Sequence, residues 1–242
     1  MKRIHESGSV LVFILIAVAL FGALSYTVAQ MMRGGNAEAI SEQQASILAD
    51  EILGTARQIR QASQAIRISN GCEDTDISFE NPSVGGYTHS PVAQDACKIY
   101  NSAGGGLSYI VPPSDWLDQT LSSTPALYGE WFFPEGVCVS NIGTGGSCPD
   151  SDNFDIIAVL PYVERQICIQ INEKLGVDNP GGNPPQETGD AWRTSNDKFQ
   201  GVYSGSGKLL QQSNQMNGCF EGDSSSTPPA GTYHFFQVIL PR

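Results

Sequence analysis

The chain has few positive charges and no cluster of them. Only 13 of its 242 residues are Lys or Arg, against 25 Asp or Glu. A net charge of −12 without a basic patch repels the phosphate backbone of nucleic acids. The composition therefore excludes DNA and RNA as expected partners.

Motifs for metal binding and catalysis are also missing. The histidines are scattered and no Cys-x-x-Cys pair occurs, so no zinc-ligand pattern is present. The sequence contains neither Gly-x-Ser-x-Gly nor His-Glu-x-x-His. The segment "SGSGK" at 204–208 fails as a phosphate loop, because Val202 replaces the first glycine and Leu209 replaces the Ser or Thr that binds magnesium. These absences favour a protein that is not an enzyme.

Turn-forming residues, by contrast, are abundant. The 26 Gly and 14 Pro predict a loop-rich body rather than a helical bundle. A chain of 242 residues can bury a substantial core, as one large domain or as one domain with an extended element.

The six cysteines all follow residue 70, and their number is even. If this part of the chain leaves the cytoplasm, disulfides are expected, because exported proteins meet an oxidising environment. Several connectivities are possible, and proximity along the chain favours the pairs Cys72–Cys97, Cys138–Cys148 and Cys168–Cys219.

An apolar segment of twenty residues, 10–29, lies near the N-terminus. As a helix it would span roughly 30 Å, the thickness of a bilayer core. Lys2 and Arg3 precede it, which predicts that the N-terminus stays in the cytoplasm and the rest of the chain crosses.

Three interpretations of this segment are open. It is typical of a secretory signal peptide, with Thr27 and Ala29 as the small residues before a cleavage site after Ala29. It would also serve as an uncleaved anchor. In both cases the rest is a secreted or membrane-tethered soluble domain of unknown binding or hydrolytic activity. The third interpretation depends on the residues around the segment.

A second helix is predicted almost directly after the apolar segment. Residues 36–68 contain no proline, and apolar residues recur every three or four positions, which indicates an amphipathic helix. Only residues 33–35 separate the two, so residues 9–67 would form one spine of about 88 Å. The predicted apolar stripe consists of Ala45, Leu48, Ile52, Ala56, Ile59, Ala62 and Ile66.

This layout resembles that of type IV pilins and of the pseudopilins of type II secretion. The shared features are a short basic leader ending in Gly8, an apolar helix, an amphipathic continuation and a small cysteine-bearing C-terminal domain. The resemblance implies that a prepilin peptidase cleaves the Gly8–Ser9 bond and that the apolar helix is retained. It implies a single-pass protein of the bacterial inner membrane, whose headgroup is periplasmic or extracellular in a filament. Its partners would be other pilin or pseudopilin subunits, contacted through the N-terminal helix.

Two residues depart from the pattern of major pilins. Ser9 stands where those proteins usually carry Phe or Met after cleavage, and Phe13 stands in place of a glutamate. In the family, that glutamate is thought to meet the amino terminus of a neighbouring subunit, and the tip pseudopilin similarly lacks it. The resemblance therefore implies a minor, tip-like structural subunit.

The rest of the chain is predicted to form the headgroup. Residues 137–139, 154–160 and 231–240 are typical of strands, and residues 161–175 predict a helix that Gly176 ends. A hairpin is expected across 198–212. The expected fold is α+β, with a loop-rich, disulfide-bearing antiparallel headgroup after the spine. Its parts are a leader (1–8), a transmembrane and filament-core helix (9–32), an amphipathic continuation (36–68) and a headgroup (69–242).

One acidic cluster is a candidate calcium site, and no other cofactor is expected. Closely spaced oxygen ligands suit calcium, and some pseudopilin headgroups bind this ion. The spacing departs from an EF-hand loop, and a solvated loop explains the cluster equally simply. The candidate ligands are Asp150, Asp152, Asn153 and Asp155.

Overall fold

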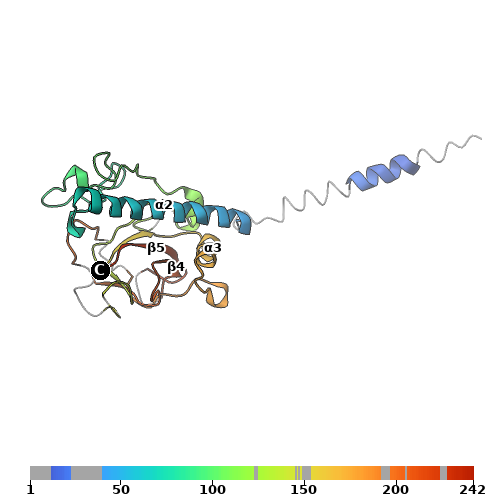
Figure 1. Cartoon of the computed structure of the whole chain (residues 1–242). Helices are drawn as coiled ribbons and strands as arrows, with labels where there is room; N and C mark the ends of the chain where they lie inside the picture. Colours follow the sequence, from blue (N-terminus) through green and yellow to red (C-terminus); the bar gives the residue numbers. More distant parts are fainter. Residues whose placement is uncertain are drawn as a thin grey trace, which may run out of the picture. The chain divides into compact units, whose positions relative to one another are not determined.

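The computed structural model describes residues 12–22 and most of residues 40–242. The residues of the second range left out are 123–124, 145, 147, 149–153, 192–196, 205 and 224–227. The chain divides into two compact units, Met1–Ser41 and Glu42–Arg242. Most of the described residues belong to the second unit (Figure 1).

The centre of the second unit is a three-stranded antiparallel sheet. Its strands are β2 (Ile156–Leu160), β4 (Asn217–Glu221) and β5 (Tyr233–Leu240), in the order β2-β5-β4. Every residue of β2 and all but the first of β5 are buried. Such continuous burial is typical of strands that are covered on both faces. The apolar runs at 154–160 and 231–240 are therefore strands, as predicted.

A second, two-stranded sheet lies against the first. Strand β1 (Val137–Val139) pairs in parallel with β3 (Gly207–Leu209). The hairpin predicted across 198–212 is wrong, because Gly207–Leu209 pairs with β1 and Lys198 pairs with Pro134. Gly207 allows this close approach, since a Cβ at that position would lie 2.6 Å from the carbonyl oxygen of Ala191.

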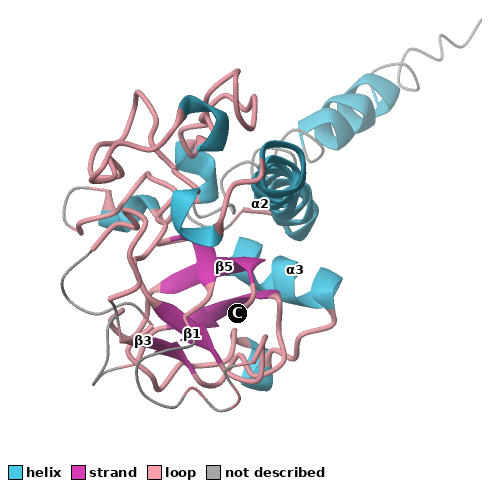
Figure 2. Ribbon diagram, turned by 60° about the vertical axis from the view of Figure 1, so that its left-hand side comes forward, coloured by secondary structure: helices cyan, strands magenta, loops and turns pink. Residues whose placement is uncertain are grey.

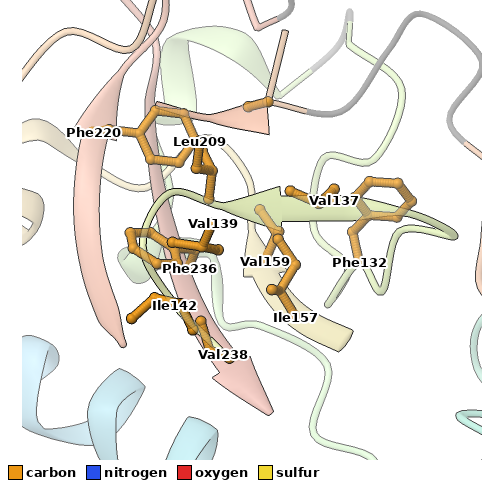
Figure 3. Packing of buried hydrophobic residues seen from close by; sticks show 11 residues of the cluster. Phe132, Val137, Val139, Ile142, Ile157, Val159, Leu209, Phe220, Phe236 and Val238 are labelled. Carbon is orange, nitrogen blue, oxygen red and sulfur yellow. The ribbon is translucent and has the colours of Figure 1, made fainter. Parts of the chain in front are cut away.

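The main apolar cluster fills the space between the two sheets (Figure 3). Ile157 and Val159 of β2 and Phe236 of β5 meet residues of β1 and β3 there. Burying each such side chain contributes about 1.5–3 kcal/mol. The cluster consists of Phe132, Val137, Val139, Ile142, Ile157, Val159, Ala191, Leu209, Phe220, Phe236 and Val238.

Helix α2 (Glu42–Asn70) is 29 residues long and runs beside the three-stranded sheet (Figures 1 and 2). It contacts β5 and helix α3 (Arg165–Leu175). All seven residues of the predicted stripe are buried, which confirms the amphipathic pattern although the helix bounds are shifted from 36–68. Four alanines on this face let the helix backbone approach the sheet closely.

Helix α3 is bounded by side-chain and glycine caps. The Glu164 carboxylate accepts hydrogen bonds from the N–H groups of Gln166 and Ile167, and Gly176 ends the helix with a φ of 71°. The end at Gly176 was predicted, whereas the start lies four residues after Pro161. Short 3₁₀ helices occupy Asp74–Asp76, Asp95–Cys97, Ser114–Trp116, Gln119–Leu121 and Pro180–Gly182.

The expected helical spine is wrong. Of the expected apolar helix, the structure describes residues 12–22, and these eleven helical residues rise about 16 Å. None of the helices in the described parts of the chain combines the length and the apolar composition needed to cross a bilayer. The expected fold is therefore corrected to a mixed α/β fold with two small sheets, one of them parallel.

The expected single-pass position in the inner membrane is corrected as well. It depended on a continuous apolar helix over residues 9–32, and the described helix in that range is the short one at 12–22.

Candidate functional site

The helix over residues 12–22 exposes an apolar surface, and we call it the apolar helix. Phe13 is 70% exposed and Phe21 is 77% exposed. A contiguous surface of this kind marks a site of interaction, because each large apolar side chain gains about 1.5–3 kcal/mol when it is buried. Its exposed large hydrophobic residues are Val12, Phe13, Ile14, Leu15, Ile16, Val18, Leu20 and Phe21.

Helix α2 is fixed to the rest of the second unit along its length. Near its N-terminal end, the Lys174 ammonium lies 2.8 Å from the Asp50 carboxylate. The indole N–H of Trp116 donates to the carboxylate of Glu51 across 3.1 Å. These contacts join α2 to α3 and to the 114–116 turn, so the helix and the headgroup form one unit.

The C-terminal end of α2 is held covalently. The Asn70 amide donates to the carbonyl oxygen of Ala96 across 2.7 Å, and the disulfide Cys72–Cys97 follows at once. Arg67 forms an ion pair with Asp74 at 2.9 Å. The last turn of the helix is thereby tied to the segment 95–97.

The three disulfides join the pairs that proximity along the sequence favours. Besides Cys72–Cys97, they are Cys138–Cys148 and Cys168–Cys219. The last of these links α3 to β4, and the Asn172 amide supports it. That amide donates to the Cys219 carbonyl at 3.0 Å and accepts from the Cys219 N–H at 2.8 Å.

The candidate calcium ligands fall largely outside the described residues. Asp150, Asp152 and Asn153 are not described, whereas Asp155 is 1% exposed. Its two carboxylate oxygens accept from the N–H groups of Val139 and Arg242, each at 2.9 Å. Burial raises the pKa of Asp155 from 3.8 to about 6. Within the described ranges, no three His, Cys, Asp or Glu side chains are grouped so as to hold a metal ion.

The predicted processing sites also lie outside the described residues. These are the Gly8–Ser9 bond and the alternative cleavage site after Ala29. Cleavage at either place stays a prediction.

His234 is a packing residue, as its place in an apolar strand indicates. It is fully buried, and burial lowers the pKa of its imidazole well below 6.5. Its Nδ1 accepts from the Tyr162 N–H at 3.2 Å, and its Nε2 lies 2.7 Å from the Thr232 hydroxyl. The ring is therefore neutral and held in place by its neighbours.

Glu187 carries a buried carboxylate that the sequence pattern did not predict. It is completely buried and accepts hydrogen bonds from the N–H groups of Gly189, Leu210 and Gln211 at 2.9–3.3 Å. The segment around it is polar and rich in glycine and proline, so the sequence predicts an exposed loop. The structure instead uses Glu187 to join this loop to the residues after β3.

Comparison of the chain with protein-family models, with characterised proteins and with solved structures finds no match. The features that bear on function are therefore the exposed apolar helix, helix α2 and the disulfide-bonded unit to which α2 belongs.

Proposed function

We propose that the chain is a pilin-like structural subunit, of the minor or pseudopilin type, of a type IV pilus or a type II secretion-like filament. The observation that carries the proposal is the exposed apolar helix, which precedes in the chain an amphipathic helix whose apolar face is buried in a disulfide-bonded headgroup. In this role the protein works by packing against its neighbours rather than by catalysis.

The apolar helix has the composition expected of a helix that packs against other helices. Ala17, Ala19 and Gly22 are small residues among the large apolar ones, and small residues allow close approach between helices. The helices of neighbouring subunits are the proposed partners of this surface.

The position of Phe13 supports a minor rather than a major subunit. Its side chain is apolar and 70% exposed at the place where major pilins carry a glutamate. Phe13 cannot pair with the amino terminus of a neighbour as a carboxylate does, so it suits a subunit that is not added repeatedly.

The disulfides support a location of the protein outside reducing compartments. All six cysteines are paired within the described unit. Disulfides persist in oxidising environments, which an exported filament subunit meets.

N-terminal sequencing of the mature protein from its own host tests the proposal. A pilin-like subunit processed by a prepilin peptidase begins at Ser9. A start at Gln30 supports the alternative, an exported soluble domain with an ordinary signal peptide, and an intact Met1 supports an uncleaved chain. Either of these results contradicts the pilin-like role.

A substitution at the cleavage site sharpens this test. Gly8→Ala is expected to block maturation, because the peptidase of this family cuts after glycine, and unprocessed protein should accumulate on an immunoblot. Gly35→Ala, a glycine substitution outside the leader, serves as the matched control and should be processed normally. Normal maturation of Gly8→Ala would count against the proposed role.

A further inference from the structure

Residues 107–113 run past helix α2 without a turn, a bend or a helix, and they belong to neither sheet. We call residues 107–111, with the sequence "LSYIV", the open segment. In the described parts of the chain, no hydrogen bond is made by the backbone N–H or carbonyl groups of its last four residues. Tyr, Ile and Val are residues that strands favour. The open segment therefore has the composition of a strand but, among the described residues, no strand that pairs with it.

The open segment is held in place by its neighbours. At its start, the Leu107 N–H donates to the carbonyl oxygen of Ile99 across 3.2 Å. In its middle, the Tyr109 hydroxyl accepts from the N–H of Trp131 across 2.9 Å. Just beyond its end, Pro112 is buried. Because these contacts already fix the segment, a partner that pairs with its backbone has little of this chain to order.

The open segment also lacks the features that protect free strand edges. Proteins usually protect such edges with charged side chains, lysine above all, or cover them. Here Ile110 is 44% exposed and Val111 is 56% exposed, and residues 99–114 contain no charged side chain. The prolines at 112 and 113 end the segment, but each of residues 108–111 keeps its N–H group. An unprotected apolar edge of this kind is a template for a strand from another chain.

The charges near the open segment indicate what kind of chain would pair with it. Asp115 and Asp118 are the only charged residues in the sequence from 99 to 129. Between them, the indole N–H of Trp116 donates to the carboxylate of Glu51 across 3.1 Å, so a third acidic group lies at this end of the segment. A second copy of the protein would bring the same carboxylates together, with a net charge of −12 on each chain, and would be repelled. The partner that fits is therefore a segment of another protein with basic residues next to apolar ones.

We propose that the open segment is a docking site for an extended, basic segment of another protein, which adds to it as a β-strand. Backbone hydrogen bonds to residues 108–111 supply the affinity, and apolar side chains of the partner cover Ile110 and Val111. The nearby carboxylates attract the lysines or arginines of the partner. The site lies wholly within the second unit and does not depend on the proposed filament role.

Amide hydrogen exchange of the full chain, followed by NMR, tests the docking site with a synthetic peptide as the probe. The peptide is acetyl-Lys-Val-Thr-Val-Thr-Val-Lys-amide, which favours an extended conformation and is basic at both ends. Because successive residues of a strand direct their N–H groups to opposite edges, saturating peptide should slow the exchange of alternate amides within 108–111 by roughly tenfold or more. Exchange that the peptide leaves unchanged, or that is already slow in the free chain, would overturn the proposal.

Two altered peptides separate strand pairing from apolar or charge attraction. The same peptide with N-methyl groups on its five internal residues keeps the side chains and the charges but loses these N–H donors, and it should bind at least roughly tenfold more weakly. A peptide with Glu in place of both Lys should also bind more weakly, with the largest difference at low salt. Equal binding of the N-methylated peptide would contradict strand addition, and equal binding of the acidic peptide would contradict a basic partner.

Val111→Lys places a protecting charge on the open segment and tests the site from the side of the protein. It should weaken binding of the lysine peptide by roughly tenfold. Val92→Lys is the matched control and should leave binding unchanged, because Val92 is 66% exposed and lies outside the open segment. Equal effects of the two substitutions would contradict the site. If Val111→Lys instead abolished self-association of the chain and left peptide binding intact, a second copy would be the occupant and the proposal would be wrong.

Discussion

The buried carboxylate of Asp155 should make the protein more stable at mildly acidic pH than at neutral pH. Asp155 is 1% exposed, and its carboxylate oxygens accept from the backbone N–H groups of Val139 and Arg242. Burial, the largest influence, raises its pKa from 3.8 to about 6, although the two hydrogen bonds and the Arg242 charge act in the opposite direction.

The sign and size of the effect follow from the difference in proton binding. Between pH 3.8 and about 6 the folded protein holds a proton on Asp155 that the unfolded chain has lost. The free energy of unfolding therefore falls as the pH rises through this window. A shift of about two pKa units corresponds to at most about 3 kcal/mol.

Urea unfolding of the wild type and of Asp155→Asn at several pH values isolates this contribution. The variant is neutral throughout, so the stability difference, wild type minus variant, should fall by up to about 3 kcal/mol between pH 4 and pH 6 and then level off. Burial also raises the pKa of Glu164 and of Glu187, and the subtraction removes their contributions. A difference that is constant, or that grows with pH, would refute the reasoning and show that the backbone hydrogen bonds outweigh burial.

Two further sets of substitutions test the way the second unit is held together. Glu187→Ala should cost about 3 kcal/mol in urea unfolding, because it removes the acceptor of the N–H groups of Gly189, Leu210 and Gln211, whereas the exposed Glu173→Ala should cost under about 0.5 kcal/mol. Equal costs would contradict the role of Glu187. Replacing Cys168 and Cys219 by alanine should destabilise by about 4 kcal/mol, and replacing Cys138 and Cys148 by about 3 kcal/mol, because the closed loops differ in length, with separations of 51 and 10 residues. The reverse order in thermal or urea unfolding would mean that loop length does not govern these bonds.

The buried face of α2 and the central strands could be predicted because the order of residues within each segment specifies them. The three-to-four-residue period of the Ala45–Ile66 stripe specifies the buried face of α2 without knowledge of what covers it. The continuous apolar runs of β2 and β5 similarly predict strands covered on both faces. The disulfide pairs followed from proximity, since the cysteines pair consecutively along the chain, as 72–97, 138–148 and 168–219.

The predictions that were wrong concern how separate segments of the chain pair with one another or continue into one another. Residues 198–212 have a hairpin pattern, but β3 instead pairs with β1, about seventy residues earlier, and no local pattern reports such a partner. The spine was inferred by joining two helical segments across residues 33–35, although sequence periodicity cannot specify that neighbouring helices are continuous. The calcium site stays a prediction, because three of its four candidate ligands lie outside the described residues; the carboxylate of the fourth, Asp155, accepts from the backbone of β1 and of Arg242. Glu187 was missed because two of its donors, the N–H groups of Leu210 and Gln211, lie more than twenty residues away in the chain.

The disulfide at the end of α2 determines how a mechanical load would pass through the molecule. A pull applied along α2 toward its N-terminus reaches the segment 95–97 through the sulfur bond between Cys72 and Cys97, two residues beyond the helix. Separating the C-terminal end of the helix from the segment 95–97 requires breaking this covalent bond. A load that reaches this end therefore passes to a second stretch of backbone as well as to the apolar contacts of α2.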